Sequence, residues 1–161
     1  MDGEFGVSHR VFENSQQMAA CWQCVTASAG YPTVAIELAK CGAGGAGGAD
    51  WNNKFSIHIA KKELHAVASV LLGFSESFEA KFHGAKRNKS YELRRDASSL
   101  RITISDAGPK KTIQIGLDSA FWLATFVVGA IVKNAPPGTP ESMIIPLIQR
   151  TQPSISKTIG A

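Results

Sequence analysis

The sequence predicts an α+β fold built from two ββββα repeats, with two antiparallel sheets packed on two helices. Two segments, residues 55–73 (FSIHIAKKELHAVASVLLG) and 111–129 (KTIQIGLDSAFWLATFVVG), align without a gap. In each, alternating apolar residues typical of a strand precede an amphipathic run typical of a helix. The aligned identities are Ile57/Ile113, Ile59/Ile115, Ala68/Ala124 and Gly73/Gly129. Each segment is therefore interpreted as the last strand and the helix of a repeated unit.

The second repeat shows its strands clearly. Four segments alternate apolar and polar side chains at the period of two expected for strands: residues 77–84, 89–96, 99–106 and 111–117. A basic turn (AKRN) follows the first strand, and DAGPKK joins the third to the fourth. We expect Asp118 to cap the following helix, residues 119–133, because its carboxylate can accept from free N–H groups of the first turn.

The first repeat has the same order of elements. Its expected strands are residues 8–13, 19–27, 32–40 and 53–60. The second of these (AACWQCVTA) could equally form a helix. Leu64, Val67, Ala68 and Leu71 share one helical face, and Gly73 is a typical stop. The Gly/Ala run between the last two strands (CGAGGAGGAD) is expected to be a mobile hairpin loop.

Length and composition indicate one domain. The chain has 161 residues, and we expect a single domain at residues 1–135, made of units at about 8–73 and 77–134, followed by a Pro-containing tail at 136–161. The longest apolar run, residues 120–132, falls short of the roughly 18 residues that span a membrane, so no membrane partner is expected. Three cysteines and the absence of a secretory pattern indicate a reducing, cytoplasmic location.

Basic charge is concentrated in one region. The whole chain has a formal net charge of +4, yet residues 81–111 contain nine Lys/Arg and three Asp/Glu, a net charge of +6. The remainder is therefore slightly acidic. A local cluster of this kind is typical of a surface that binds a polyanion, although a solvated sheet face without a partner can look the same.

A twice-used ββββα unit with basic and aromatic strand residues resembles the Whirly family of single-stranded DNA-binding proteins. Mitochondrial guide-RNA-binding proteins have a similar architecture, and positive-cofactor-four proteins build it by dimerisation. The resemblance covers about residues 8–134. The Lys-Gly-Lys-Ala-Ala-Leu motif of plant Whirly proteins would fall at 19–27, where this chain reads AACWQCVTA. No site residue is therefore carried over, and the resemblance points to a distant bacterial, phage or mobile-element member.

The resemblance implies a non-catalytic, single-stranded DNA-binding oligomer, a dimer or tetramer, without a cofactor. Binding a single strand requires cations along the phosphates and aromatic rings on which bases stack. The predicted nucleic-acid contacts are Lys81, Lys86, Arg87, Lys89, Tyr91, Arg94, Arg95, Arg101, Lys110 and Lys111. No set of residues suited to reading bases is evident, so little sequence preference is expected. DNA is favoured over RNA, with an RNA-binding or annealing protein as an alternative.

The aromatic candidates differ in their surroundings. Phe82 shares a strand face with Phe78 and Ala80, so we expect it in the core rather than under a base. Tyr91 shares its face with Leu93 and Arg95, and the pattern leaves its position open. Trp22 and Trp51 are further stacking candidates.

Other chemistries are favoured less. The spacing of Cys21 and Cys24 is that of a redox or half-zinc motif, but buried, inert thiols are expected there. Glu79 and Lys81 match the carboxylate-x-lysine of a metal-dependent nuclease, whose second metal ligand would have to be Asp50. The alternatives to single-strand binding are therefore a small metal-dependent nuclease and a scaffold whose basic face meets an acidic protein.

The last helix of the second repeat is apolar on nearly every side. Two interpretations follow: self-association through this helix, or a central helix wrapped by both sheets. The tail beyond it carries Met143, Ile144, Ile145, Leu147 and Ile148. These residues are expected to dock on their own domain or on a neighbour.

Overall fold

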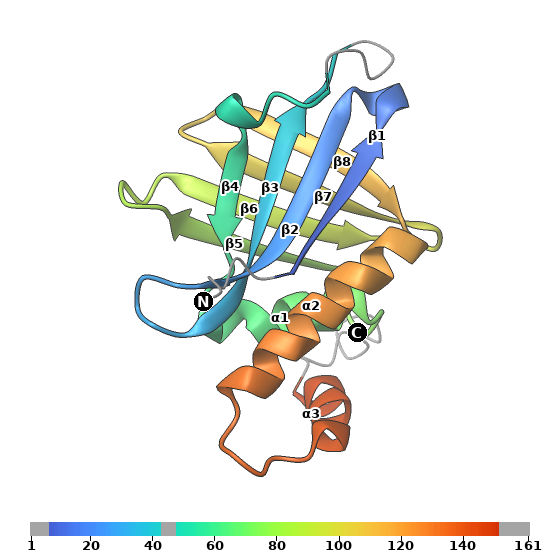
Figure 1. Ribbon diagram of the computed structural model, residues 1–161. Coiled ribbons are helices and arrows are strands. Elements are labelled where there is room, and N and C mark those ends of the chain that lie inside the picture. Colours follow the sequence, from blue (N-terminus) through green and yellow to red (C-terminus); the bar gives the residue numbers. More distant parts are fainter. Residues whose placement is uncertain (1–6, 43–47, 152–161) are drawn as a thin grey trace, which may run out of the picture.

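The computed structural model describes residues 7–42 and 48–151, and this part of the chain forms two antiparallel four-stranded sheets with three α-helices (Figure 1). Sheet 1 has the order β1-β2-β3-β4 and sheet 2 the order β5-β6-β7-β8, so every strand pairs with its neighbour in sequence. The predicted α+β class and the ββββα repeats are therefore confirmed.

The bounds of the elements agree with the alternation of the sequence. In sheet 1 they are β1 (Ser8–Glu13), β2 (Met18–Thr26), β3 (Pro32–Lys40) and β4 (Phe55–His58). In sheet 2 they are β5 (Ser77–His83), β6 (Lys89–Arg95), β7 (Ser99–Asp106) and β8 (Lys110–Gly116). The helices are α1 (Leu64–Leu71), α2 (Leu117–Asn134) and α3 (Ile144–Arg150). The segment AACWQCVTA is thus a strand, and most of the Gly/Ala run, residues 43–47, lies outside the described residues.

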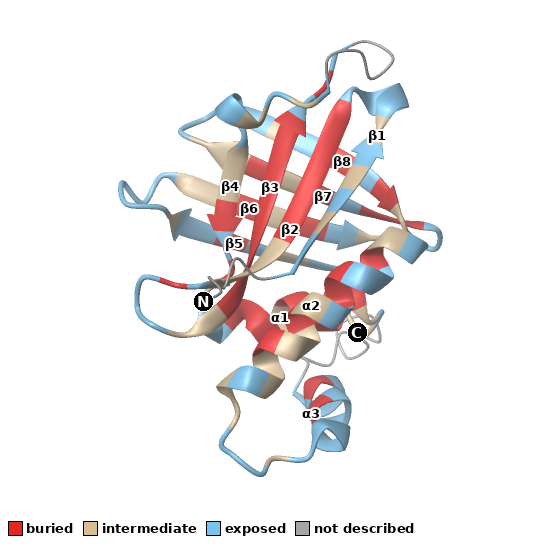
Figure 2. Cartoon of the chain, in the orientation of Figure 1, coloured by how far each residue is buried: buried red, intermediate tan, exposed pale blue. Residues whose placement is uncertain are grey.

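The two sheets pack face to face with their strands crossing, and α1 and α2 lie side by side against them (Figure 1). Helix α1 contacts β5 and β6, whereas α2 contacts β2, β3, β7 and β8. Buried residues follow β2, β3 and the inner side of both helices (Figure 2). The helices of both repeats therefore contribute to the core between the sheets.

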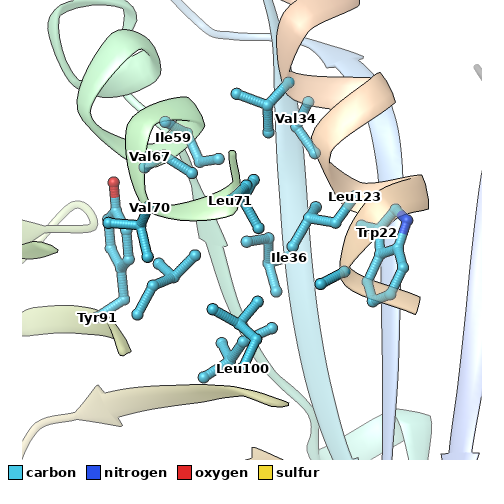
Figure 3. Packing of buried hydrophobic residues seen from close by; sticks show 14 of the residues in the cluster. Trp22, Val34, Ile36, Ile59, Val67, Val70, Leu71, Tyr91, Leu100 and Leu123 are labelled. Carbon is cyan, nitrogen blue, oxygen red and sulfur yellow. The ribbon is translucent and has the colours of Figure 1, made fainter. Parts of the chain in front are cut away.

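Strand alternation supplies the core side chains. Leu100, Ile102 and Ile104 of β7 are fully buried, while the residues between them face outward. In Figure 3, Ile36 of β3, Leu71 of α1 and Leu100 of β7 converge from three layers. Each such side chain contributes about 1.5–3 kcal/mol relative to an exposed position. The core therefore holds both sheets and both helices together.

The repeated segments occupy equivalent positions. All four aligned isoleucines (57, 59, 113 and 115) are buried, and so are Ala68 of α1 and Ala124 of α2. The glycine pair differs: Gly73 follows α1 with a positive φ of 82°, whereas Gly129 lies inside α2. The repeat therefore conserves strand and helix packing, and its second helix continues past the point where the first one ends.

Asp118 does not cap α2, and this prediction was wrong. The helix begins at Leu117, and Gly116 occupies the N-cap position with extended backbone angles. Asp118 instead lies in the first turn, where a negative charge still interacts favourably with the helix dipole. A side chain at Gly116 would meet Asp118 Oδ1 at 2.5 Å, so the close approach of this carboxylate favours glycine there.

Helix α2 is, among the described residues, the one helix long and apolar enough by length and composition to cross a membrane. A helix in a protein core meets the same criteria. One side of α2 buries Ala120, Leu123, Ala124 and Val127 against the domain. Phe121 and Trp122 on its other side are 58% and 51% exposed. The interpretation of α2 as a helix wrapped on every side by the two sheets was therefore wrong for this chain.

The described part of the tail docks on its own domain. Ile144 and Ile148 of α3 are buried, and α3 contacts α1 and α2. Met143, Ile145 and Leu147 remain exposed. Residues 152–161 of the predicted tail lie outside the described residues.

Truncating Ile102 should destabilise the domain strongly. The Ile102→Ala variant leaves a cavity between the sheets, and we expect a loss of about 2–5 kcal/mol in the free energy of unfolding. Urea denaturation measures it. The same truncation at Ile145, which is half-exposed on α3, is the matched control and should have much less effect. Equal losses in both variants would contradict this position of the core.

Candidate nucleic-acid interface

The outer face of sheet 2 carries two arginines directly opposite each other. Arg94 of β6 pairs in register with Arg101 of β7, which in turn lies opposite Gln114 of β8. Both arginines are exposed. Among the described residues, neither guanidinium has a hydrogen bond or an ion-pair partner. We refer to Arg94 and Arg101 as the arginine pair.

A small cavity of about 160 Å³ adjoins the arginine pair. Its lining is Glu76, Arg94, Arg95, Asp96, Arg101 and Gln114. Gln114 is fixed there, because its Nε2 donates to Ser99 Oγ (2.7 Å) and its backbone N–H donates to Gln16 Oε1 (2.8 Å). Gln16 belongs to the β1–β2 turn, so a turn residue of sheet 1 hydrogen-bonds to the exposed backbone edge of β8. The neighbour of Arg101 on β8 is therefore held in place by hydrogen bonds to Ser99 and Gln16.

The remaining outer face carries charges of both signs. Glu79 and Glu92 lie opposite each other in the next row, followed by Thr103 and Thr112. Lys81 pairs with Glu79 at 3.4 Å, and both are largely exposed. Lys110 lies beyond, in register with Ser105. The predicted cationic surface is thus interrupted by Glu79 and Glu92. Neither arginine of the pair forms an ion pair among the described residues, although Glu76 and Asp96 also line the adjoining cavity.

Three more of the predicted cations are engaged by the protein itself. Lys89 Nζ donates to the Ser56 carbonyl at 3.3 Å and lies 3.8 Å from Asp106 Oδ2. Lys111 Nζ lies 3.5 Å from the centre of the Phe55 ring. Arg95 Nη1 donates to the Leu71 carbonyl at the end of α1, at 2.7 Å. These half-buried contacts join sheet 2 to sheet 1 and to α1, so the three side chains have structural partners already.

Tyr91 cannot stack on a base in this fold, so its inclusion in the predicted site was wrong. It is 2% exposed, and its hydroxyl donates to Glu63 Oε1 at 2.8 Å. Burial, together with the charge of Glu63, raises the pKa of Tyr91 far above its ordinary value. Trp22 is also fully buried, whereas Trp51 is half-exposed beneath the guanidinium of Arg10, 5.2 Å from the ring centre.

Glu63 is a buried carboxylate that accepts hydrogen bonds from three directions. Besides Tyr91, its partners are His83 Nε2 at 2.9 Å and the Ala60 N–H at 3.1 Å. Burial alone would raise the pKa of Glu63, but the hydrogen bonds from His83, Ala60 and Tyr91 outweigh it and lower the pKa. This carboxylate therefore joins the start of α1 to strands β5 and β6.

The strand β5 changes register before the turn that follows it. Ala80 pairs with Tyr91 and His83 pairs with Lys89, so two residues on β5 oppose one on β6 in a β-bulge. His83 consequently faces Glu63, and Phe82 is 68% exposed. The expectation of a core position for Phe82 was therefore wrong, because it assumed unbroken alternation along β5. Lys86 and Arg87 in the following turn are also exposed.

The other candidate sites are dispersed. Cys21 and Cys24 lie three positions apart on β2 and so point to opposite faces, which cannot form a common metal or redox site. Asp50 accepts a hydrogen bond from Asn53 at 2.8 Å in the β3–β4 connection, on the other sheet from Glu79. Within residues 7–42 and 48–151, no three His, Cys, Asp or Glu side chains are grouped to hold a metal ion.

Comparison with known proteins identifies the fold. No protein-family model and no curated protein matches the sequence. Among solved structures, the Whirly protein WHY1 of Arabidopsis thaliana is similar with a TM-score of 0.59 and 16% identity, over 82% of this chain and 92% of that chain. The plant transcriptional regulator PBF-2 is similar with a TM-score of 0.56 and 11% identity, over 92% of this chain and 97% of that chain. Trypanosomal MRP1/MRP2 is similar with a TM-score of 0.59 and 10% identity, over 81% of this chain and 87% of that chain.

These similarities confirm the Whirly-like fold that the order of elements predicted. At such identities they establish the arrangement of strands and helices alone. The positions of the arginine pair, the bulge and the buried carboxylate are therefore properties read from this chain.

The stability of the protein should depend on the ionisation of Glu63. Because its pKa in the folded state is lowered from the ordinary value of 4.5, the carboxylate stabilises the fold above that value. This contribution is lost as the pH falls through the lower, folded-state pKa. Urea denaturation of wild type and of Glu63→Gln at about pH 7 and about pH 4 should therefore show a smaller acid-induced loss in the variant.

Glu79→Gln is the control for this measurement, because Glu79 is an exposed carboxylate of the neighbouring strand. It should keep the acid dependence of the wild type. If Glu63→Gln also kept the full acid dependence, the buried carboxylate would not have the stabilising role assigned to it.

Proposed function

We propose that this protein is a non-catalytic single-stranded nucleic-acid-binding protein whose contact surface is the outer face of sheet 2. The main support for this proposal is the arginine pair, in which two exposed arginines lie directly opposite each other on neighbouring strands. Like charges directly opposite in a sheet are destabilising. Phosphate groups relieve this repulsion, and arginine binds them with two parallel hydrogen bonds.

A single strand fits this surface better than a duplex does. The cations lie on a strand face with the short side chains Thr103, Thr112 and Ser105 between the arginine pair and Lys110. Reading duplex DNA generally needs a helix or a two-stranded ribbon that enters the major groove. An extended strand needs only a cationic path and flat surfaces for its bases. The Whirly-like fold supports the same ligand, and from that resemblance we favour DNA over RNA.

The number of phosphates contacted should be small. Glu79 and Glu92 interrupt the outer face, and Lys89, Arg95 and Lys111 have partners within the protein. We therefore assign binding to Arg94, Arg101, Lys110 and the exposed turn residues Lys86 and Arg87. Because the assigned contacts are cations suited to phosphates, we expect sequence preference to be weak.

Neutralising the arginine pair should weaken binding and its salt dependence. For Arg94→Gln/Arg101→Gln we expect an affinity for single-stranded DNA about 10- to 100-fold lower, on the order of 0.7–1.4 kcal/mol per arginine. Each lost phosphate contact should also reduce the slope of log affinity against log salt by about 0.7. Fluorescence anisotropy over a salt series measures both quantities.

The control is Lys40→Gln/Lys62→Gln, which removes the same charge from exposed positions outside sheet 2 and outside α2. It should change affinity little. Parallel gel shifts with single-stranded DNA, single-stranded RNA and duplex DNA test the ligand class. Tighter binding to the duplex, or magnesium-dependent cleavage that is lost in Glu79→Ala, would overturn the proposal.

We also propose that the protein acts as an oligomer through the uncovered side of α2. The rings of Phe121 and Trp122 there contact each other edge to face, with 5.1 Å between their centres, and both residues are more than half exposed. Beside them lies a groove of about 480 Å³ between α2 and sheet 1, lined by Val7, Cys24, Val25, Thr26, Pro32, Thr33, Thr125, Phe126, Gly129, Ala130 and Lys133. Large exposed aromatic residues next to such a groove are typical of an interaction surface.

Replacing these aromatic residues should dissociate the oligomer. Phe121→Ser/Trp122→Ser alters side chains that are mostly outside the core, so the circular dichroism spectrum should persist. Light scattering should then give a lower mass than for the wild type. A wild-type mass equal to one chain would contradict self-association, while leaving the nucleic-acid surface to be judged by its own measurements.

A further inference from the structure

The backbone of β5 holds Phe82 in an unusual conformation. Its φ is +65°, in the left-handed region that large side chains rarely adopt. Glycine or asparagine is normally found at such positions, and a strained residue of another type costs on the order of 1–3 kcal/mol. Phe82 is also 68% exposed and does not pack against the hydrophobic core. Neither backbone preference nor burial therefore accounts for a phenylalanine here.

The next residue explains how the ring is held outward. His83 contacts Glu63 through Nε2 and packs edge-on against Tyr91, with 5.3 Å between the ring centres. These contacts place His83 on the inner face, where unbroken alternation would have placed Phe82. The bulge accommodates the change, and Gly84, with a φ of +82°, starts the turn. The buried pair of His83 and Glu63 thus fixes Phe82 in solvent.

One cation lies over the exposed ring, and two more are close in sequence. The guanidinium carbon of Arg87 lies 6.0 Å from its centre, and Lys81 and Lys86 are exposed nearby in sequence. A flat aromatic face beside positive charges is the combination that single-strand binding uses, with a base on the ring and phosphates on the cations. Within the described part of the chain, the other large exposed aromatic residues are Phe12 of β1 and Phe121 and Trp122 of α2, and they lie outside sheet 2.

We propose that Phe82 is a base-stacking residue, presented by the β-bulge as a platform for one unpaired base. Lys86 and Arg87 bind the flanking phosphates, and His83 is the positioning residue that keeps the ring outside. This inference rests on the proposed single-strand binding and deepens it. It also accounts for the strain, because a ring turned into the core would offer no surface to a base.

The Phe82→Gly variant separates stacking from folding. Glycine relieves the positive φ, so the unfolding temperature should stay equal or rise. Affinity for a short oligothymidine should fall roughly 5- to 150-fold, because one stacked base contributes about 1–3 kcal/mol. Phe12→Ser, which removes another half-exposed aromatic ring, is the control and should bind like the wild type.

An abasic oligonucleotide of the same length tests the mechanism. It keeps the phosphates and lacks the bases, so wild type and Phe82→Gly should bind it equally. If Phe82→Gly binds oligothymidine as well as the wild type does, the platform is wrong and the proposed function stands. If the wild type binds no single strand, the proposed function itself fails.

The positioning role of His83 has its own readout. His83→Ala removes the contact to Glu63, and affinity should fall for oligothymidine but not for the abasic strand. His83→Gln keeps a donor for the carboxylate and should restore most of the difference. Equal losses on both oligonucleotides, or no rescue by glutamine, would overturn this role.

Discussion

The buried carboxylate of Glu63 is the interaction on which much of this structure depends. It precedes the helix of the first repeat, yet two of its donors, His83 and Tyr91, belong to the sheet of the second. A carboxylate removed from water is tolerated only when hydrogen bonds replace its hydration. The two repeats are therefore held in one relative position by a polar contact as well as by apolar packing. The same contact fixes the register of β5.

Strand alternation predicted the fold because both sheets have a buried face. The isoleucines of β7 and β8 repeat at every second position, which leaves one register for each strand. The helices were predicted in the same way, from apolar residues that repeat at the helical period of about 3.6 residues. The N-cap of α2 was predicted at Asp118 because both Asp118 and Gly116 are residue types found at the start of helices. The close approach of the Asp118 carboxylate to the Gly116 backbone, which favours glycine at that position, is visible only in the structure.

The candidate site was less predictable, for a physical reason. The clustering of charge in residues 81–111 is visible in sequence, but strand alternation and turns distribute those cations over both faces and both ends of sheet 2. Arg95 and Lys111 point to neighbouring elements, whereas Arg94 and Arg101 point outward. The sequence pattern did not show whether Tyr91 is buried or exposed, because its hydrogen-bond partner, Glu63, lies 28 positions away in the sequence. No local pattern contains that information.

The turn after β5 has a consequence for variation among relatives of this chain. Surface hairpins ordinarily tolerate insertions and deletions, since their tips contact little else. Here residues 84–88 connect His83, which is bound to Glu63, to Lys89, which is bound to Ser56. A change in loop length would pull one of these two anchors away. We therefore expect natural diversity in this hairpin to appear as substitution of its tip residues, with the number of residues held constant.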